Sequence, residues 1–249
     1  MEWYRVAFGE LYPLVYAHRD DAEAEQVAAA FAGVFRGAEA PVLDVACGGG
    51  RYTAAFGRAG VPTIGVDLSE FLLVEAVERR GLRDRVVLGD MRCLPFRDGC
   101  AAGAVNMFTS FGYFDDEGDN ERAIAEIARI LRPGGRFLMD FLNAEGIRRV
   151  SAETTRRREG GVDIEERREH DPSGRFLIKH VRVVPPDGEG VSYRERVRLY
   201  TAGELEAMLE RAGLGVVGRW GDYAAAAFVA AASPRLILLA EKREAGAMG

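Results

Sequence analysis

The sequence predicts an α/β fold built on a mostly parallel sheet with helices on both faces. Residues 42–142 contain five short apolar runs separated by segments of helical periodicity, which is the pattern of consecutive βα units. The first three runs are almost continuously apolar, as strands are when helices cover both of their faces. A length of 249 residues with 48% hydrophobic side chains suits one large domain, so we expect residues 1–249 to form a single domain.

The five predicted strands are separated by recognisable helix signals. They lie at residues 42–47, 62–68, 86–90, 104–110 and 135–142. After the second strand, Ser69 is placed as a helix N-cap and Gly81 is placed to end that helix. Before the fifth strand, apolar residues from Ala123 to Leu131 share one helical face, and we expect Pro133 and the glycines after it to stop the helix.

Three further segments surround this core. Residues 10–35 have an amphipathic helical pattern, so we expect residues 1–38 to form an N-terminal helical arm. In residues 151–200, charged and apolar residues alternate, which predicts an antiparallel β insertion with one face exposed to water. Because the segment follows the fifth strand, we expect it to lie over the carboxyl side of the sheet, where ligands bind in such folds. The apolar side chains expected on its other face are Val191, Tyr193, Val197 and Leu199. A helix at residues 201–212 and strands at 214–220 and 235–242 complete the chain.

Charge and composition exclude several classes of protein. The formal net charge is -6 without any sustained run of Lys or Arg, so a nucleic-acid partner is not expected. No stretch has the length of a membrane span and the N-terminus lacks a signal-peptide pattern, so we expect a cytoplasmic protein without a membrane partner. Cys47, Cys93 and Cys100 form no CxxC pair, and with three His residues in the chain we expect neither a metal site nor disulfides.

A glycine-rich turn follows the first predicted strand. The segment VLDVACGGGRYT places Asp44 near the strand end and three glycines before a helix. Glycines there let backbone N–H groups approach a ligand at the carboxyl end of the sheet, although such a turn can also merely connect strand and helix. The dinucleotide pattern G-x-G-x-x-G fails because position 53 is Thr53, and no Gly-Lys-Ser/Thr follows, so the phosphate-loop pattern fails as well.

Acidic residues end the second and third predicted strands. Asp67 follows Asp44 by 23 residues, and Asp90 follows Asp67 by the same interval, about one βα unit. Each acid singly could be a solvated helix cap. Because the carboxyl ends of neighbouring parallel strands meet, the three acids and the glycine turn together predict a nucleoside-like ligand, with Asp67 placed to accept from ribose hydroxyls.

Jointly these motifs resemble the class I S-adenosylmethionine-dependent methyltransferases. The resemblance rests on VLDVACGGG, GVDLS, GDMRCLPF, NMFTSFGYF and LRPGGRFLMDF, covers residues 40–142 and extends loosely to the C-terminal segments. It implies a Rossmann-like seven-stranded sheet whose last strand is antiparallel, and S-adenosyl-L-methionine as cofactor. This cofactor has no phosphate but carries a sulfonium, an ammonium and a carboxylate, which suits acids, backbone amides and aromatic faces.

The resemblance also implies which residues hold the cofactor. Asp44 and the backbone around Ala46 and Gly48 would hold the methionine moiety, Asp67 the ribose, and Asp90 with Met91 the adenine. Further predicted cofactor-binding residues are Gly50, Leu68, Tyr16 and Met107. Ala46 departs from the family pattern, which has a glycine there, and its methyl group is tolerated if its φ is ordinary.

Aromatic residues and the insertion are the candidates for the rest of the site. Tyr12, Tyr16, Phe108, Phe111 and Tyr113 could supply cation–π contacts or a lid, or be plain core. In methyltransferases of similar N-terminal pattern the arm covers the cofactor, which favours Tyr12, Tyr16 and Arg19. His18 is the histidine expected near the mouth of the site, and no residue is assigned as catalytic.

The predicted acceptor pocket draws on the loop after the fourth strand and on the insertion, through Ser110, Phe111, Tyr113, Tyr193, Arg196 and Tyr200. The PPxY-type tetrapeptide of amide-directed members is absent, since the position reads NMFT. We therefore predict a methyltransferase, monomeric or homodimeric, that methylates a small-molecule N or O acceptor by in-line displacement. Two alternatives stay open: a catalytically silent S-adenosylmethionine-binding module and an NAD-dependent oxidoreductase.

Overall fold

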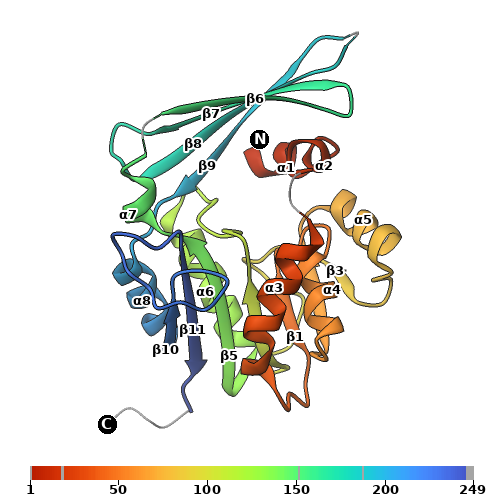
Figure 1. Cartoon of the computed structure of the whole chain (residues 1–249). Coiled ribbons are helices and arrows are strands. Elements are labelled where there is room, and N and C mark those ends of the chain that lie inside the picture. The colour runs from red at the N-terminus through yellow and green to blue at the C-terminus, as the bar shows by residue number, and fades with distance from the viewer. Residues whose placement is uncertain (1, 18–19, 151, 187, 245–249) are drawn as a thin grey trace.

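The computed structural model describes residues 2–17, 20–150, 152–186 and 188–244, which form two separate β-sheets (Figure 1). The larger sheet has seven strands in the order β10-β11-β5-β4-β1-β2-β3. The strands are β1 (Val42–Val45), β2 (Thr63–Asp67), β3 (Val86–Leu88), β4 (Ala101–Asn106), β5 (Leu131–Leu142), β10 (Leu214–Trp220) and β11 (Arg235–Lys242). Only β11 runs antiparallel to its neighbours, β5 and β10, which confirms the predicted Rossmann-like sheet with its antiparallel last strand.

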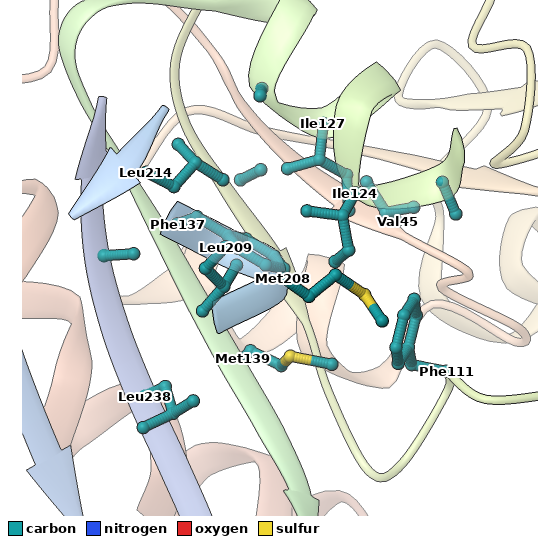
Figure 2. Packing of buried hydrophobic residues seen from close by; sticks show 14 of the residues in the cluster. Val45, Phe111, Ile124, Ile127, Phe137, Met139, Met208, Leu209, Leu214 and Leu238 are labelled. Carbon is teal, nitrogen blue, oxygen red and sulfur yellow. The ribbon is translucent and has the colours of Figure 1, made fainter. Parts of the chain in front are cut away.

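Helices cover both faces of this sheet and enclose the main core. They are α3 (Asp21–Phe31), the 3-10 helix η1 (Ala32–Phe35), α4 (Arg51–Arg58), α5 (Glu70–Arg80), α6 (Glu117–Ile130), α7 (Ala144–Ile147) and α8 (Ala202–Arg211). Apolar side chains of α3 and α4 pack on one face, and those of α6 and α8 pack on the other. Figure 2 shows the second of these cores, where Ile124 and Met208 lie against sheet residues such as Phe137 and Met139.

The helix caps follow the sequence signals closely. The Ser69 hydroxyl accepts from the backbone N–H of Leu72, and Gly81 ends α5 with a left-handed φ of 67°, as predicted. Thr201 opens α8 with a full capping box. The predicted end of α6 is wrong, because Leu131 already has extended backbone and pairs with β4.

Two strands differ from their predicted form. β3 is an edge strand on which Leu88 is 56% exposed, so the expectation that helices cover both faces of the first three strands is wrong for β3. β4 begins earlier than predicted and ends at Asn106. It ends there because Phe108 and Thr109 have left-handed φ values of 57° and 63°, which a strand cannot accommodate.

The N-terminal arm, for which an amphipathic helical pattern was noted over residues 10–35, consists of several short helices. The described residues form α1 (Trp3–Ala7), α2 (Tyr12–Val15), α3 and η1. Asp20 starts α3 as a new helix by accepting from the N–H of Glu23. His18 and Arg19 lie outside the described residues. The Ser69 hydroxyl donates to the Phe8 carbonyl at 2.7 Å, which ties the start of the arm to the sheet domain.

The insertion is the predicted antiparallel sheet, with strands β6 (Glu153–Glu159), β7 (Val162–His170), β8 (Phe176–Val184) and β9 (Val191–Arg198). Figure 1 shows it beyond the end of the larger sheet, with α1 and α2 between the two. Of its expected apolar face, Val191 is 45% exposed and Leu199 lies past the strand end. No helix in the described ranges is long and apolar enough to cross a membrane.

Candidate active site

A cavity of about 600 Å³ lies between the carboxyl ends of the parallel strands, the helices α1 and α2, and the four-stranded sheet. Nine of the ten predicted cofactor residues line it: Tyr16, Asp44, Ala46, Gly48, Asp67, Leu68, Asp90, Met91 and Met107. The structure therefore brings together residues that are separated by up to 91 positions in the chain.

Gly50 is the predicted site residue that does not line the cavity. It precedes α4 with a φ of 76°, and a Cβ on it would come within 2.5 Å of the Leu82 side chain. Gly50 therefore allows the turn into α4 and the close packing of that helix beside α5.

The methyl group of Ala46 was expected to be tolerated on the condition that the residue has an ordinary, negative φ, and that condition is not met. Its φ is 59°, in the left-handed region where a Cβ clashes with the following carbonyl oxygen. The strain costs about 1–2 kcal/mol. A glycine would adopt the same conformation without that cost.

Asp44 lies beneath the glycine turn and is almost fully buried. Its carboxyl group accepts from the Thr53 hydroxyl at 2.6 Å. Burial raises the pKa of Asp44 to about 7, since the Thr53 hydrogen bond offsets only part of the desolvation and the nearby Asp67 charge adds to it.

The Asp67 carboxylate stabilises two turns, the glycine turn after β1 and the turn that leads into α5. Its Oδ2 accepts from the Gly48 backbone N–H at 2.7 Å, and its Oδ1 accepts from the Ser69 N–H at 2.8 Å. Burial raises the pKa of Asp67, against the opposing effect of these backbone donors. An ionised carboxylate offers about four acceptor positions, so acceptor capacity remains for ligand hydroxyls.

Asp90 lies just after β3 and pairs with the guanidinium of Arg92. Arg92 donates to both of its oxygens, at distances from 2.6 to 3.2 Å. Although burial alone would raise the pKa of Asp90, the Arg92 hydrogen bonds hold it below its usual range.

The predicted acceptor residues divide between the cavity and the core. Ser110 and Tyr113 line the cavity, whereas Phe111, Tyr193, Arg196 and Tyr200 do not. Phe111 and Tyr200 are 1% exposed and pack against Phe141 in the main core. Their placement in the pocket was wrong, because the chain after β9 turns Tyr200 inward and its hydroxyl donates to Glu117.

A buried ion pair that the sequence analysis missed supports the loop after β4. Asp140 is fully buried and accepts from the Phe108 backbone N–H, from Tyr223 and from two guanidinium nitrogens of Arg235. Arg235 also donates to the Thr109 hydroxyl at 2.9 Å. These bonds hold the two left-handed residues at the cavity wall.

The four-stranded sheet contributes a row of charges that the sequence analysis also missed. Cross-strand pairing places Glu153 opposite Arg168, Arg168 opposite Lys179, and Lys179 opposite Glu195. All four line the cavity. We call them the roof row. The sequence shows the alternation of charged and apolar residues along each strand. It does not show the register between strands, which is what aligns these four residues.

The donors and acceptors around the cavity fit S-adenosylmethionine better than a phosphate-bearing nucleotide. Three carboxylates from successive strand ends face one end of the cavity beside the open glycine turn. These groups can accept from hydroxyls, an ammonium and an exocyclic amine. Aromatic rings of the arm and of the β4 loop, including Tyr16 and Tyr113, also line the cavity, and aromatic faces suit a sulfonium.

Comparisons with known proteins agree with this class of fold. A family model for a methyltransferase domain matches residues 42–135. The structure of the CcbJ methyltransferase from Streptomyces caelestis aligns with a TM-score of 0.77 at 24% identity, covering 96% of this chain and 98% of that one. DesVI from Streptomyces venezuelae aligns with a TM-score of 0.67 at 26% identity, covering 94% and 97%. The fold is that of a Rossmann-like methyltransferase.

A curated relative gives the family assignment. The dTDP-3-amino-3,4,6-trideoxy-alpha-D-glucopyranose N,N-dimethyltransferase of Streptomyces venezuelae is 33% identical over 225 residues, which are 86% of this chain and 92% of that protein. The chain therefore belongs to the S-adenosylmethionine-dependent methyltransferases. It is an enzyme whose cofactor is S-adenosylmethionine, which removes the oxidoreductase and silent-module alternatives.

Proposed function

We propose that this enzyme methylates an amine nitrogen of a small, polar, sugar-like acceptor. The observation that carries the proposal is the continuity of the cavity from the three strand-end acids to the roof row, which leaves a polar compartment beyond the cofactor end. The relative from Streptomyces venezuelae bears the name of an amino-sugar N,N-dimethyltransferase and matches along nearly its whole length. Among N and O acceptors, we therefore favour nitrogen.

We infer that the strand-end acids hold the cofactor in three parts. Asp44 and the backbone at Ala46 and Gly48 would take the methionine moiety, Asp67 the ribose hydroxyls, and Asp90 with Met91 the adenine. Leu68 and Met107 lie on the same cavity wall and supply apolar contact, and Tyr16 closes the cavity from the arm.

The bound cofactor supplies a methyl group on a sulfonium, already activated for displacement. The protein's own contribution is then chiefly positioning, which can supply several kcal/mol of barrier reduction when two reactants are held in line. The Asp140–Arg235 pair fixes Phe108 and Thr109, which line the cavity. The N-terminal arm covers the cavity on the side away from the larger sheet and excludes water there. An uncharged amine needs no separate deprotonation before it attacks, so no dedicated base is required.

Transfer of radiolabelled methyl tests the proposal. The enzyme is incubated with labelled S-adenosylmethionine and matched sugars that differ only by an amine or a hydroxyl at one position. We expect label on the amino sugars alone, and less label with Asp67→Ala at cofactor concentrations that just saturate the wild type. Label on hydroxyl sugars alone, or on neither while the cofactor binds, contradicts the proposal.

A further inference from the structure

The N-terminal arm meets the roof row through one buried polar cluster. The Tyr16 hydroxyl lies 2.6 and 2.7 Å from the two carboxylate oxygens of Glu195. Lys179 Nζ donates to the Tyr16 oxygen and, at 3.0 Å, to Glu166, and it forms an ion pair with Glu195 at 3.0 Å. All four residues are 9% exposed or less, so the cluster is shielded from bulk water.

Hydrogen-bond capacity within this cluster is unevenly used. The Lys179 ammonium donates to two oxygens, those of Tyr16 and Glu166, and pairs with the charge of Glu195. The charge of Lys179 is balanced by two carboxylates, of which Glu166 also binds Arg157. Glu195 accepts from Tyr16 and pairs with the Lys179 charge, which leaves acceptor positions on its two oxygens to spare.

Only part of the cluster faces the ligand space. Tyr16, Lys179 and Glu195 line the cavity, whereas Glu166 does not. Lys179 is already engaged with three oxygens of the cluster, and the Glu195 carboxylate is the group at the cavity with acceptor positions to spare. A ligand group that meets it must bring hydrogen-bond donors.

We propose that Glu195, acting together with the Tyr16 hydroxyl it orients, is the positioning residue for the acceptor amine, an inference that rests on the proposed function. The amine directs its N–H groups to these acceptors, and its lone pair is thereby turned toward the cofactor end of the cavity. As the nitrogen shares its lone pair with the incoming methyl group it becomes cationic, and its N–H groups become stronger donors. The bonds to a carboxylate-polarised hydroxyl therefore strengthen toward the transition state, which is the condition for an interaction to accelerate a reaction. A sugar hydroxyl at that position brings one donor and gains less.

Probe binding separates this role from a structural one. Binding of 3-amino-3-deoxyglucose and of glucose is measured by calorimetry on protein saturated with S-adenosylhomocysteine. We expect the wild type to bind the amino sugar at least tenfold more tightly, and Glu195→Gln and Tyr16→Phe to reduce that ratio below threefold.

Glu166→Gln is the matched control, because Glu166 shares Lys179 as partner and lies on the same sheet but does not line the cavity. It should lower the melting temperature yet keep the amine-to-hydroxyl ratio. Melting temperature reports whether each variant is folded, and affinity for S-adenosylhomocysteine reports separately whether Tyr16→Phe also weakens the cofactor, for which Tyr16 is a predicted contact.

Two results overturn the inference: a wild type with no amine preference, including no measurable binding of either sugar, or a folded Glu195→Gln variant that keeps the full preference. If either result is obtained but labelled methyl still appears on amino sugars, the proposed function stands and only the role of Glu195 is rejected. Failure of all methyl transfer to amines removes the proposed function itself.

Discussion

Asp67→Ala is expected to weaken cofactor binding without unfolding the protein. The carboxylate is placed to accept from ribose hydroxyls, and a hydrogen bond to a charged group contributes about 1.5–3 kcal/mol. Affinity for S-adenosylhomocysteine should therefore fall about 10- to 150-fold. Calorimetry on the wild type and the variant measures this difference.

The same substitution removes two bonds that exist without ligand. Asp67 accepts from the N–H groups of Gly48 and Ser69, both of which are partly exposed, so water replaces much of what is lost. We expect a loss of about 1–2 kcal/mol in unfolding free energy. Asp67→Asn keeps one acceptor oxygen and should fall between the wild type and Asp67→Ala in both affinity and stability.

An unchanged affinity would refute the reasoning about Asp67. The sharpest form of that outcome is an Asp67→Ala variant that binds S-adenosylhomocysteine like the wild type while Asp90→Ala abolishes binding. The ribose would then lie at the third strand end and not at the second.

Three other substitutions follow from the geometry. Ala46→Gly should raise the unfolding free energy by about 1 kcal/mol by relieving the left-handed strain, seen as a melting temperature about 2–4 °C higher, and a lower melting temperature would contradict this. Asp44 keeps its proton in the folded chain up to pH about 7 but loses it near pH 4 when unfolded, so its contribution to stability falls as pH rises through that window. Asp44→Asn should abolish that fall in urea unfolding at pH 5 and pH 8, and an unchanged pH dependence would assign it to another group. Arg235→Met leaves Asp140 buried without its cation and should cost about 3–5 kcal/mol in thermal unfolding, whereas a loss under 1 kcal/mol would show that the pair does not hold the loop.

That the acids and the glycine turn line one cavity was predictable, because these residues are tied to strand ends. A short apolar run followed by Asp67 or Asp90 needs no knowledge of tertiary packing: in a parallel sheet the carboxyl ends of such strands meet at one edge. The caps at Ser69 and Gly81 are equally local, and the structure confirms both.

The acceptor end was not predictable, because it depends on non-local register and on backbone strain. One residue of slip in any strand of the insertion would turn a member of the roof row outward. Tyr200 looked like a pocket residue by proximity to the insertion, yet the chain direction after β9 buries it in the main core. The left-handed φ of Ala46 could not be predicted either, because alanine normally has a negative φ and nothing in the sequence marks this one as an exception.

The most direct test of the account is a crystal structure of the enzyme with S-adenosylhomocysteine and 3-amino-3-deoxyglucose bound. We predict ribose hydroxyls on Asp67, adenine beside Asp90 and Met91, and the amine within hydrogen-bond distance of Tyr16 or Glu195. The account would be contradicted by a ribose away from Asp67, or by a sugar that turns a hydroxyl to Tyr16 and Glu195 and its amine away from them.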